Sequence, residues 1–171
     1  MSITLLDDEI DAFVGPRAYN YRMRWPVAAN GERSATGFNW AAAVLSCFWL
    51  PYRKMYRATL VLYFLILSDL VAEEIYFVHM LGWPEAPAAS SRVVGLAIAI
   101  VCGVLGNRWY LSHATRAILK IRTAHPRDES YLRIVAQHGG TSVGAALAVF
   151  VIFAVIGCTG LAVTDFIARG R

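Results

Sequence analysis

The sequence has little charge and little cysteine. Of its 171 residues only 16% are charged and 57% are hydrophobic, whereas soluble proteins average about 25% charged residues. The three cysteines, Cys47, Cys102 and Cys158, are scattered through apolar segments. No close pair of cysteines indicates a zinc or redox site, so we expect these side chains to face the protein interior or lipid.

The sequence also lacks the short motifs of the common enzyme classes. It contains no nucleophile elbow, phosphate-binding loop or metalloprotease helix. The two closely spaced glycines Gly103 and Gly106 stand inside an apolar block, where no nucleotide would bind. We therefore predict a protein that is not an enzyme and that requires no cofactor.

What is present is a set of apolar blocks. The block from Thr141 to Thr164 carries no charge and would be roughly 36 Å long as a helix, longer than the ~30 Å hydrocarbon core of a bilayer. We predict an all-α integral membrane protein with three transmembrane helices, at about 58–79, 93–111 and 141–164. The segment 38–50 is apolar but short, which favours an interfacial helix. These elements form a membrane domain over 38–171.

Residues 1–37 are predicted to be a cytoplasmic arm. Apolar residues recur at helical spacing between Thr4 and Pro16, and the other face of that helix is acidic. Acidic residues in place of a basic start argue against a secretory signal. The helix either docks on protein or is a solvated terminal helix, because lipid-binding helices usually carry basic residues. Residues 17–37 are rich in turn formers, and we expect a linker near the membrane surface.

The net charge of +4 comes from basic residues that cluster beside the predicted spans, which indicates a membrane protein rather than nucleic-acid binding. This distribution places the N-terminus in the cytoplasm, with the protein multi-pass in a bacterial inner membrane. If residues 38–50 also span, the N-terminus moves outside. A basic stripe after the second span is expected to contact anionic lipid headgroups. The residues assigned to this contact are Arg108, Arg116, Lys120 and Arg122.

Two acidic residues interrupt the first predicted span. Asp69 and Glu73 lie one helical turn apart, so they share a face and could hold a proton or a cation. The alternative is a short or tilted span, in which the acids sit near the outer interface and pair with Arg92. The four histidines pose a similar choice. His79 is expected near the outer side and the other three near the inner, where His113 and His138 could approach each other as an axial pair for haem. An interfacial histidine bonded to backbone or water is more common, so haem is not favoured, although a single pigment ligand stays open.

Small residues recur every four positions in the last two spans. This spacing lets helix backbones approach closely in lipid. We predict that the two small-residue faces meet within the chain or meet a partner helix. The residues are Gly95, Ala99 and Gly103 in one span, and Gly140, Gly144 and Ala148 in the other.

Three stretches resemble a bacterial membrane family catalogued as domain of unknown function 2628. They are residues 38–42, 49–56 and 106–113, and their order and spacing also fit the family. The resemblance covers roughly residues 36–122 and implies a small multi-span protein with no assigned activity. Where the family usually has more aromatics and a Gly-Pro, residues 43–48 of this sequence have one aromatic, Phe48, and no Gly-Pro. The motif positions are Phe38, Asn39, Trp40, Trp49, Tyr52, Arg53, Lys54, Gly106, Asn107 and Tyr110.

These features favour an interaction protein over a catalyst. The first hypothesis is a non-catalytic accessory or structural subunit that packs on other subunits of a larger bacterial membrane complex, an energy-converting complex being one candidate. The second hypothesis is a small proton or cation carrier or channel that uses Asp69 and Glu73. The expected partners are the lipid bilayer, anionic headgroups and other membrane-protein subunits, and not nucleic acid.

Overall fold

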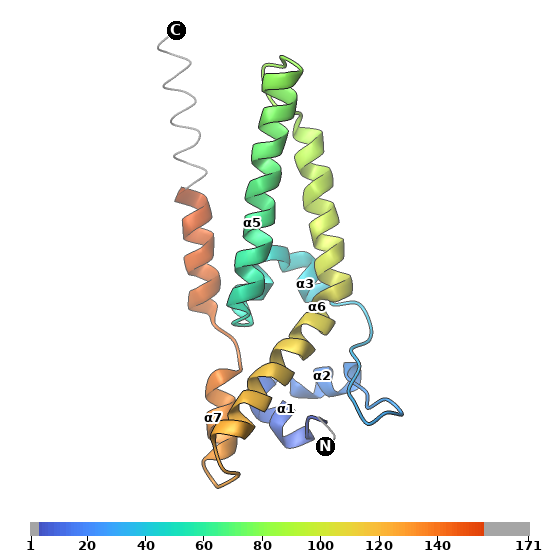
Figure 1. Cartoon of the computed structure of the whole chain (residues 1–171), viewed down its shortest axis with the longest axis vertical. Helices are drawn as coiled ribbons and strands as arrows, with labels where there is room; N and C mark the ends of the chain where they lie inside the picture. Colours follow the sequence, from blue (N-terminus) through green and yellow to red (C-terminus); the bar gives the residue numbers. More distant parts are fainter. Residues whose placement is uncertain (1–3, 156–171) are drawn as a thin grey trace.

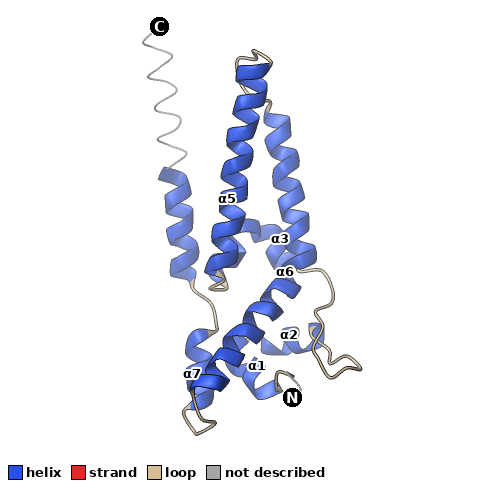
Figure 2. Cartoon of the chain, in the orientation of Figure 1, coloured by secondary structure: helices blue, strands red, loops and turns tan. Residues whose placement is uncertain are grey.

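The computed structural model describes residues 4–155, and in this range the protein is helical with no β-strand (Figures 1 and 2). A short 3-10 segment, η1, and a π-helical segment, η2, interrupt the α-helices. A further helical segment at 143–155 continues to the last described residue. The elements in order are α1 Asp7–Val14, α2 Ala18–Arg24, α3 Trp40–Leu45, η1 Ser46–Phe48, α4 Trp49–Tyr52, α5 Tyr56–Glu73, η2 Glu74–Met80, α6 Ala88–Ala124 and α7 Tyr131–His138.

The chain divides into a stem and a head, which Figure 1 shows above and below its middle. The stem consists of α5 with η2, residues 88–107 of α6, and the helical segment 143–155. The head consists of α1, α2, α7 and residues 108–124 of α6. Because α6 is long enough to run through both parts, it sets the position of the head relative to the stem. The segment formed by α3, η1 and α4 packs on the middle of α6, at the junction of the two.

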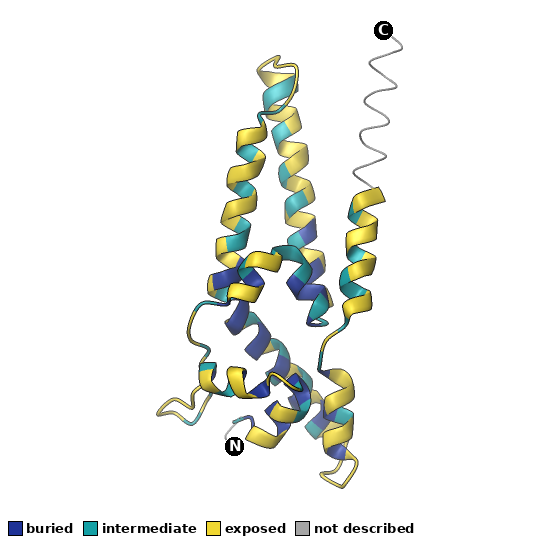
Figure 3. Cartoon of the chain, turned by 180° about the vertical axis from the view of Figure 1, so that it is seen from behind, coloured by how far each residue is buried: buried dark blue, intermediate teal, exposed yellow. Residues whose placement is uncertain are grey.

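Burial differs sharply between the two parts (Figure 3). The fully buried large side chains gather in the head and the junction, with Trp25, Trp49, Tyr110 and Phe13 among them. The stem is apolar but uncovered. Only 11% of the most apolar window of α6 is buried, and only 6% of that in the stretch Tyr131–Val155. A core helix of a water-soluble protein would show the opposite pattern, because burial of apolar surface drives its folding.

The bounds of α6 follow from two prolines. The helix begins directly after Pro87 and ends at Ala124, one residue before His125 adopts an extended backbone. The residue before a proline is pushed out of the helical region by the proline ring, and Pro126 follows His125. The second apolar helix therefore continues well beyond the predicted span of 93–111 and ends two residues before Pro126.

The expectation of three transmembrane helices is wrong for the described residues. Two stretches, Ala88–Ala124 and Tyr131–Val155, are long and apolar enough to cross a membrane. Helix α5 does not match them because Arg57, Asp69 and Glu73 fall within its 18 residues. The last predicted span, 141–164, is helical from residue 143 to 155, and its remainder lies outside the described residues.

The segment 38–50 is too short to cross a bilayer and is bent. The backbone at Ser46 has φ 46°, which separates α3 from η1 and turns the chain back along α6. The family pattern places a Gly-Pro in this region, and here the bend forms without either residue. Both α3 and η1 pack on α6, and Trp49 at the start of α4 contacts the ring of Tyr110.

The N-terminal arm is more ordered than a linker. Its first helix, α1, is shorter than expected and ends at Gly15, which has φ 78°. Residues 17–37, expected to be a linker, contain α2 and an isolated antiparallel bridge between Val27 and Arg33. The side chain of Arg33 holds this loop by donating to the backbone oxygens of Leu5 and Trp25. The arm thus packs as part of the head.

Candidate functional site around Arg53

Two buried asparagines join the first and third family-motif stretches at the junction. Asn39 Nδ2 donates to Asn107 Oδ1 at 3.0 Å, and Asn39 Oδ1 accepts from the Ala42 backbone at 3.0 Å, which caps α3. Asn107 Nδ2 donates in turn to the carbonyl oxygens of Thr36 and Gly37. Burying an amide without partners costs free energy, and this pair satisfies both side chains mutually. The pair fixes the start of α3 on α6.

Two glycines of α6 allow this close approach. A Cβ at Gly106 would come within 2.8 Å of the Ala42 Cβ, and a Cβ at Gly103 would overlap the ring of Phe38. The Asn39 backbone N–H also donates to the Gly103 carbonyl at 2.8 Å. The motif glycine at 106 therefore serves packing of α3 on α6.

Arg53 lies at the centre of an aromatic cage, with 3% of its surface exposed. Its Nη2 donates to the Tyr21 hydroxyl at 3.1 Å and its Nη1 to the Tyr110 hydroxyl at 3.3 Å. The guanidinium carbon lies 4.9 Å and 4.8 Å from the centres of those two rings. Its Nε is buried and has no hydrogen-bond partner. A cation over aromatic faces is stabilised by their quadrupoles, but its charge is not neutralised.

A cavity of about 430 Å³ opens beside this residue, and we call it the Arg53 cavity. Three arginines line it, together with amide and aromatic side chains, and no acidic residue is among the lining residues. The volume is within the range of ligand-binding pockets. The lining residues are Arg17, Asn20, Tyr21, Arg24, Asn39, Trp40, Ala41, Leu45, Trp49, Tyr52 and Arg53.

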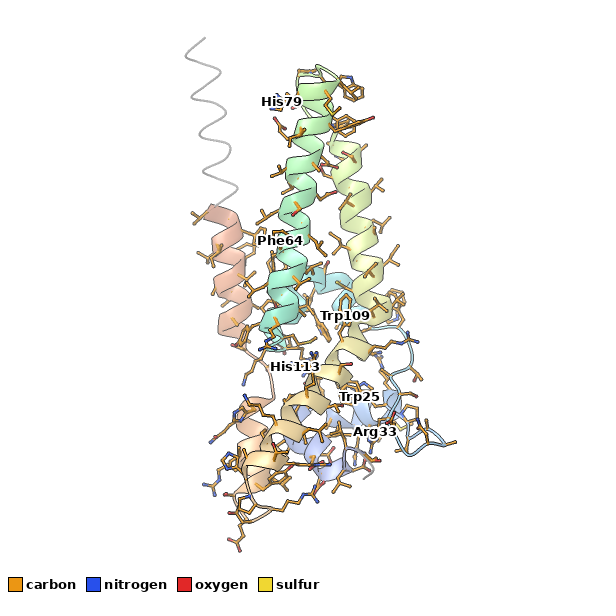
Figure 4. All side chains as sticks on the ribbon, in the orientation of Figure 1. Trp25, Arg33, Phe64, His79, Trp109 and His113 are labelled. Atoms are coloured by element: carbon orange, nitrogen blue, oxygen red, sulfur yellow. The ribbon has the colours of Figure 1, made fainter. Side chains whose placement is uncertain are left out.

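A second, larger cavity of about 860 Å³ lies between the start of α5 and α6. Its walls are mainly apolar, including Met55, Leu62 and Trp109. Arg57 and Arg116 also line it. Figure 4 shows Trp109 on α6 at the junction, below Phe64 of the stem. The groove therefore combines mainly apolar walls with basic side chains.

The head is held together by a buried carboxylate. Glu9 is fully buried, and its Oε1 accepts from Arg122 Nε at 2.8 Å, Arg127 Nη2 at 2.6 Å and the Tyr131 hydroxyl at 2.7 Å. Its Oε2 accepts from the Leu6 backbone N–H at 3.0 Å. Burial acts to raise the pKa of Glu9, but these hydrogen bonds, led by that of Arg122, outweigh it and lower the pKa from 4.5 to about 2. The acidic helix α1 is thereby docked on protein.

One member of the expected lipid-binding set has partners within the chain. Arg122 is engaged by Glu9 and by the Thr4 carbonyl, and its contact with anionic lipid stays a prediction. Arg108, Arg116 and Lys120 remain exposed on α6. Lys54 of the family motif donates from Nζ to the Gln137 carbonyl at 3.2 Å and ties α4 to the end of α7.

The two stem acids do not form a shared site in the described structure. Glu73 accepts a hydrogen bond from the Ser91 hydroxyl at 3.0 Å, rather than pairing with the neighbouring Arg92. Asp69 is partly exposed, and neither acid lines the Arg53 cavity or the larger groove. The positions of Asp69 and Glu73 therefore provide no shared acidic site that would support the predicted carrier role.

The two small-residue faces are not in contact with each other over the described residues. Gly103 packs on Phe38, and a Cβ at Gly95 or Gly144 would meet nothing within 4 Å. Gly140 lies in a turn with φ 77° before the last helical segment, so it is not part of a helix face. Contact within the chain is thus not observed, and contact with a partner helix stays a prediction.

The histidines are widely separated. Figure 4 shows His79 at the far end of the stem and His113 on α6 in the head. His113 packs against Phe13 and Tyr110, whereas His138 is exposed and bonds the Ile134 carbonyl. Within residues 4–155, no group of three or more His, Cys, Asp or Glu side chains is arranged to hold a metal ion.

Several residues of these clusters were not identified from the sequence. Tyr21 and Arg24 were assigned to a linker, and Glu9 to an acidic helix face without a named partner. The available signal for Glu9 was its position one residue before the buried Ile10 and four before Phe13, on the apolar side of α1. No short sequence pattern could indicate the hydrogen bond between Tyr21 and Arg53, because 32 residues separate them.

Comparison with known proteins adds the family and nothing further. No curated protein matches the chain, and no solved structure matches it either. The family model described as protein of unknown function (DUF2628) matches residues 10–116, which include the second half of α1, all of α2, the junction and the arginine cage. This match covers more than half of the chain. The chain therefore belongs to the DUF2628 family.

Proposed function

We propose that the protein is a non-catalytic membrane subunit whose stem lies in the bilayer and packs on the helices of partner proteins. The observation that carries the proposal is the exposed apolar stem. Leu60 and Phe64 of α5 are 72% and 70% exposed, and Leu96 of α6 is 64% exposed. Exposed apolar surface of this extent is typical of a membrane or protein interface.

The stem helices leave room for partner helices. The backbone of α6 packs closely on α3, yet it makes few close contacts with α5, although Figure 1 shows the two running side by side. Gly95 and Gly144 have open space beside them. Small residues at an open helix face permit close approach of another helix, which supports association in lipid.

The head supports a cytoplasmic position. The exposed bases Arg108, Arg116 and Lys120 lie on α6 just beyond the stem, and basic residues are enriched on the cytoplasmic side of membrane proteins. The N-terminus would then be cytoplasmic, as would both α1 and α7. We also propose that the membrane is an inner membrane and that the partner complex is an energy-converting one.

The test is to extract the protein from native membranes in a mild detergent, separate it on a native gel and identify co-migrating proteins by mass spectrometry. Migration with a larger complex at fixed stoichiometry is the expected result. Migration alone or as a small homo-oligomer would overturn the proposal. In that case proton and cation flux in liposomes, with Asp69→Asn as the first variant, becomes the next measurement.

Two variants test whether the glycine faces of the stem form the interface with the partner. Gly95→Leu and Gly144→Leu fill open faces of the stem without meeting a neighbour in the chain, so they should weaken the complex while leaving the protein folded. Leu96→Ile is the matched control on α6, because it changes shape at an exposed position without filling the glycine face. Equal recovery of the complex with all three variants would exclude these faces from the interface.

A further inference from the structure

We propose that the Arg53 cavity binds an oxyanion of the phosphate class, held by Arg17, Arg24 and Arg53. The cavity has these three guanidinium-bearing residues in its lining and no carboxylate. Guanidinium groups match phosphate oxygens in geometry as well as charge. The inference goes beyond the proposed subunit role, and only a lipid as the source of the phosphate rests on the membrane placement proposed there.

The first step is that Arg53 carries a buried charge without a counter-ion. Only 3% of its surface is exposed, and its hydrogen-bond partners are two phenol hydroxyls. Its buried Nε lacks a partner altogether. A buried charge that is neither paired nor fully hydrogen-bonded is costly. An anion in the adjoining cavity would remove much of that cost.

The second step is that no ion pair joins a cavity arginine to an acid among the described residues. Four other arginines form ion pairs with acids of α1. The Arg24 side chain donates a hydrogen bond to the Phe38 carbonyl, at 3.3 Å. The paired arginines are Arg22, Arg33, Arg122 and Arg127. Acids of α1 are thus paired with four arginines outside the cavity, and the three arginines that line the cavity leave a local positive excess there.

The third step is the place of the cavity and its walls. It lies at the junction, where Trp40 is 70% exposed and Trp49 is buried. Asn20 and Tyr52 also line it and provide further polar atoms. In the proposed membrane placement this is the level of the lipid headgroups, where tryptophan is enriched. The phosphate group can thus come from an anionic phospholipid or from free phosphate, and the binding chemistry is shared.

The experiment uses the full chain purified in a maltoside detergent, which contains no phosphate. Inorganic phosphate and short-chain phosphatidylglycerol are titrated separately, with potassium chloride at matched ionic strength as a blank. Tryptophan fluorescence reports binding because Trp40 and Trp49 line the cavity. Saturable binding of phosphate supports the proposal with free phosphate as the source. Binding of phosphatidylglycerol alone supports it with lipid as the source. A response to neither ligand overturns it.

Variants locate the site. Arg17→Gln and Arg24→Gln should each weaken binding about tenfold or more, since each removes one charge-assisted contact. Arg17 is exposed, so its replacement should not disturb folding, whereas an Arg53 variant could. Arg108→Gln is the control, because Arg108 is an exposed base that does not line the cavity. Wild-type affinity in both cavity variants, or equal loss in the control, would overturn the proposal.

Discussion

Glu9 Oε1 and Arg122 Nε are joined by a 2.8 Å hydrogen bond across 113 residues of sequence. This contact brings the first helix of the chain against the end of the longest one. Because the carboxylate is fully buried and also bonded to Tyr131, it is the point at which α1, α6 and the start of α7 are held together. The stability of the head should depend on it.

Removing the Glu9 charge should destabilise the protein strongly. Glu9→Gln leaves Arg122 without its buried partner, and breaking a buried ion pair typically costs about 3–5 kcal/mol. The thermal midpoint in detergent should fall by several degrees. Asp11→Asn is the control, since it removes only a partly exposed pair with Arg22 at 3.3 Å, worth about 1 kcal/mol or less. A similar midpoint for the two variants would contradict the central role of Glu9.

The same residue should make the head sensitive to acid. The pKa of Glu9 is about 2 in the folded protein and near 4.5 when unfolded, so the unfolded state binds the proton first. Its contribution is complete above pH 4.5 and declines as the pH falls from there toward 2. The midpoint difference between wild type and Glu9→Gln should narrow over this window. A constant difference down to pH 2 would show that Glu9 does not titrate as described.

Gly139, in the turn after α7, should not tolerate a side chain. A Cβ at Gly139 would come within 2.0 Å of the Phe13 carbonyl oxygen, which belongs to the backbone and cannot rotate away. Gly139→Ala should therefore cost about 1–3 kcal/mol, in the range of overpacking, and lower the thermal midpoint. Gly95→Ala is the matched variant, because its Cβ meets nothing. It should be neutral or slightly stabilising, since alanine favours helix. Equal effects would refute this distinction.

The buried asparagine pair should show strong coupling. Asn39→Ala leaves Asn107 Oδ1 without its donor, and Asn107→Ala leaves Asn39 Nδ2 without its acceptor, at about 1–3 kcal/mol per variant. The double variant should cost less than the sum of the two, because the shared 3.0 Å bond is lost only once. Thermal or denaturant midpoints of the four proteins give this coupling. Strict additivity would indicate that the pair does not act as a unit.

Local sequence patterns predicted much of the stem and of α6. A long uncharged run predicts a helix if it lies in lipid, because a helical backbone satisfies its own hydrogen bonds there. Pro87 and Pro126 mark the ends of α6 through their own geometry. The family stretches were also visible as sequence, and their match to DUF2628 confirms them. The number of helices long and apolar enough to cross a membrane was overestimated, because the charges within α5 were given too little weight.

Only the tertiary structure decided what the motif residues do. Asn39 reaches Asn107 and Arg53 reaches Tyr110 across 68 and 57 residues, so neither partnership leaves a periodic trace in the chain. The tyrosine cage and the acid-free cavity likewise depend on how α2, α3 and α4 fold back on α6. The sequence by itself determined which segments are helical and apolar, since those properties are local. Long-range packing decided where the buried charges meet, because charge compensation depends on distance in space.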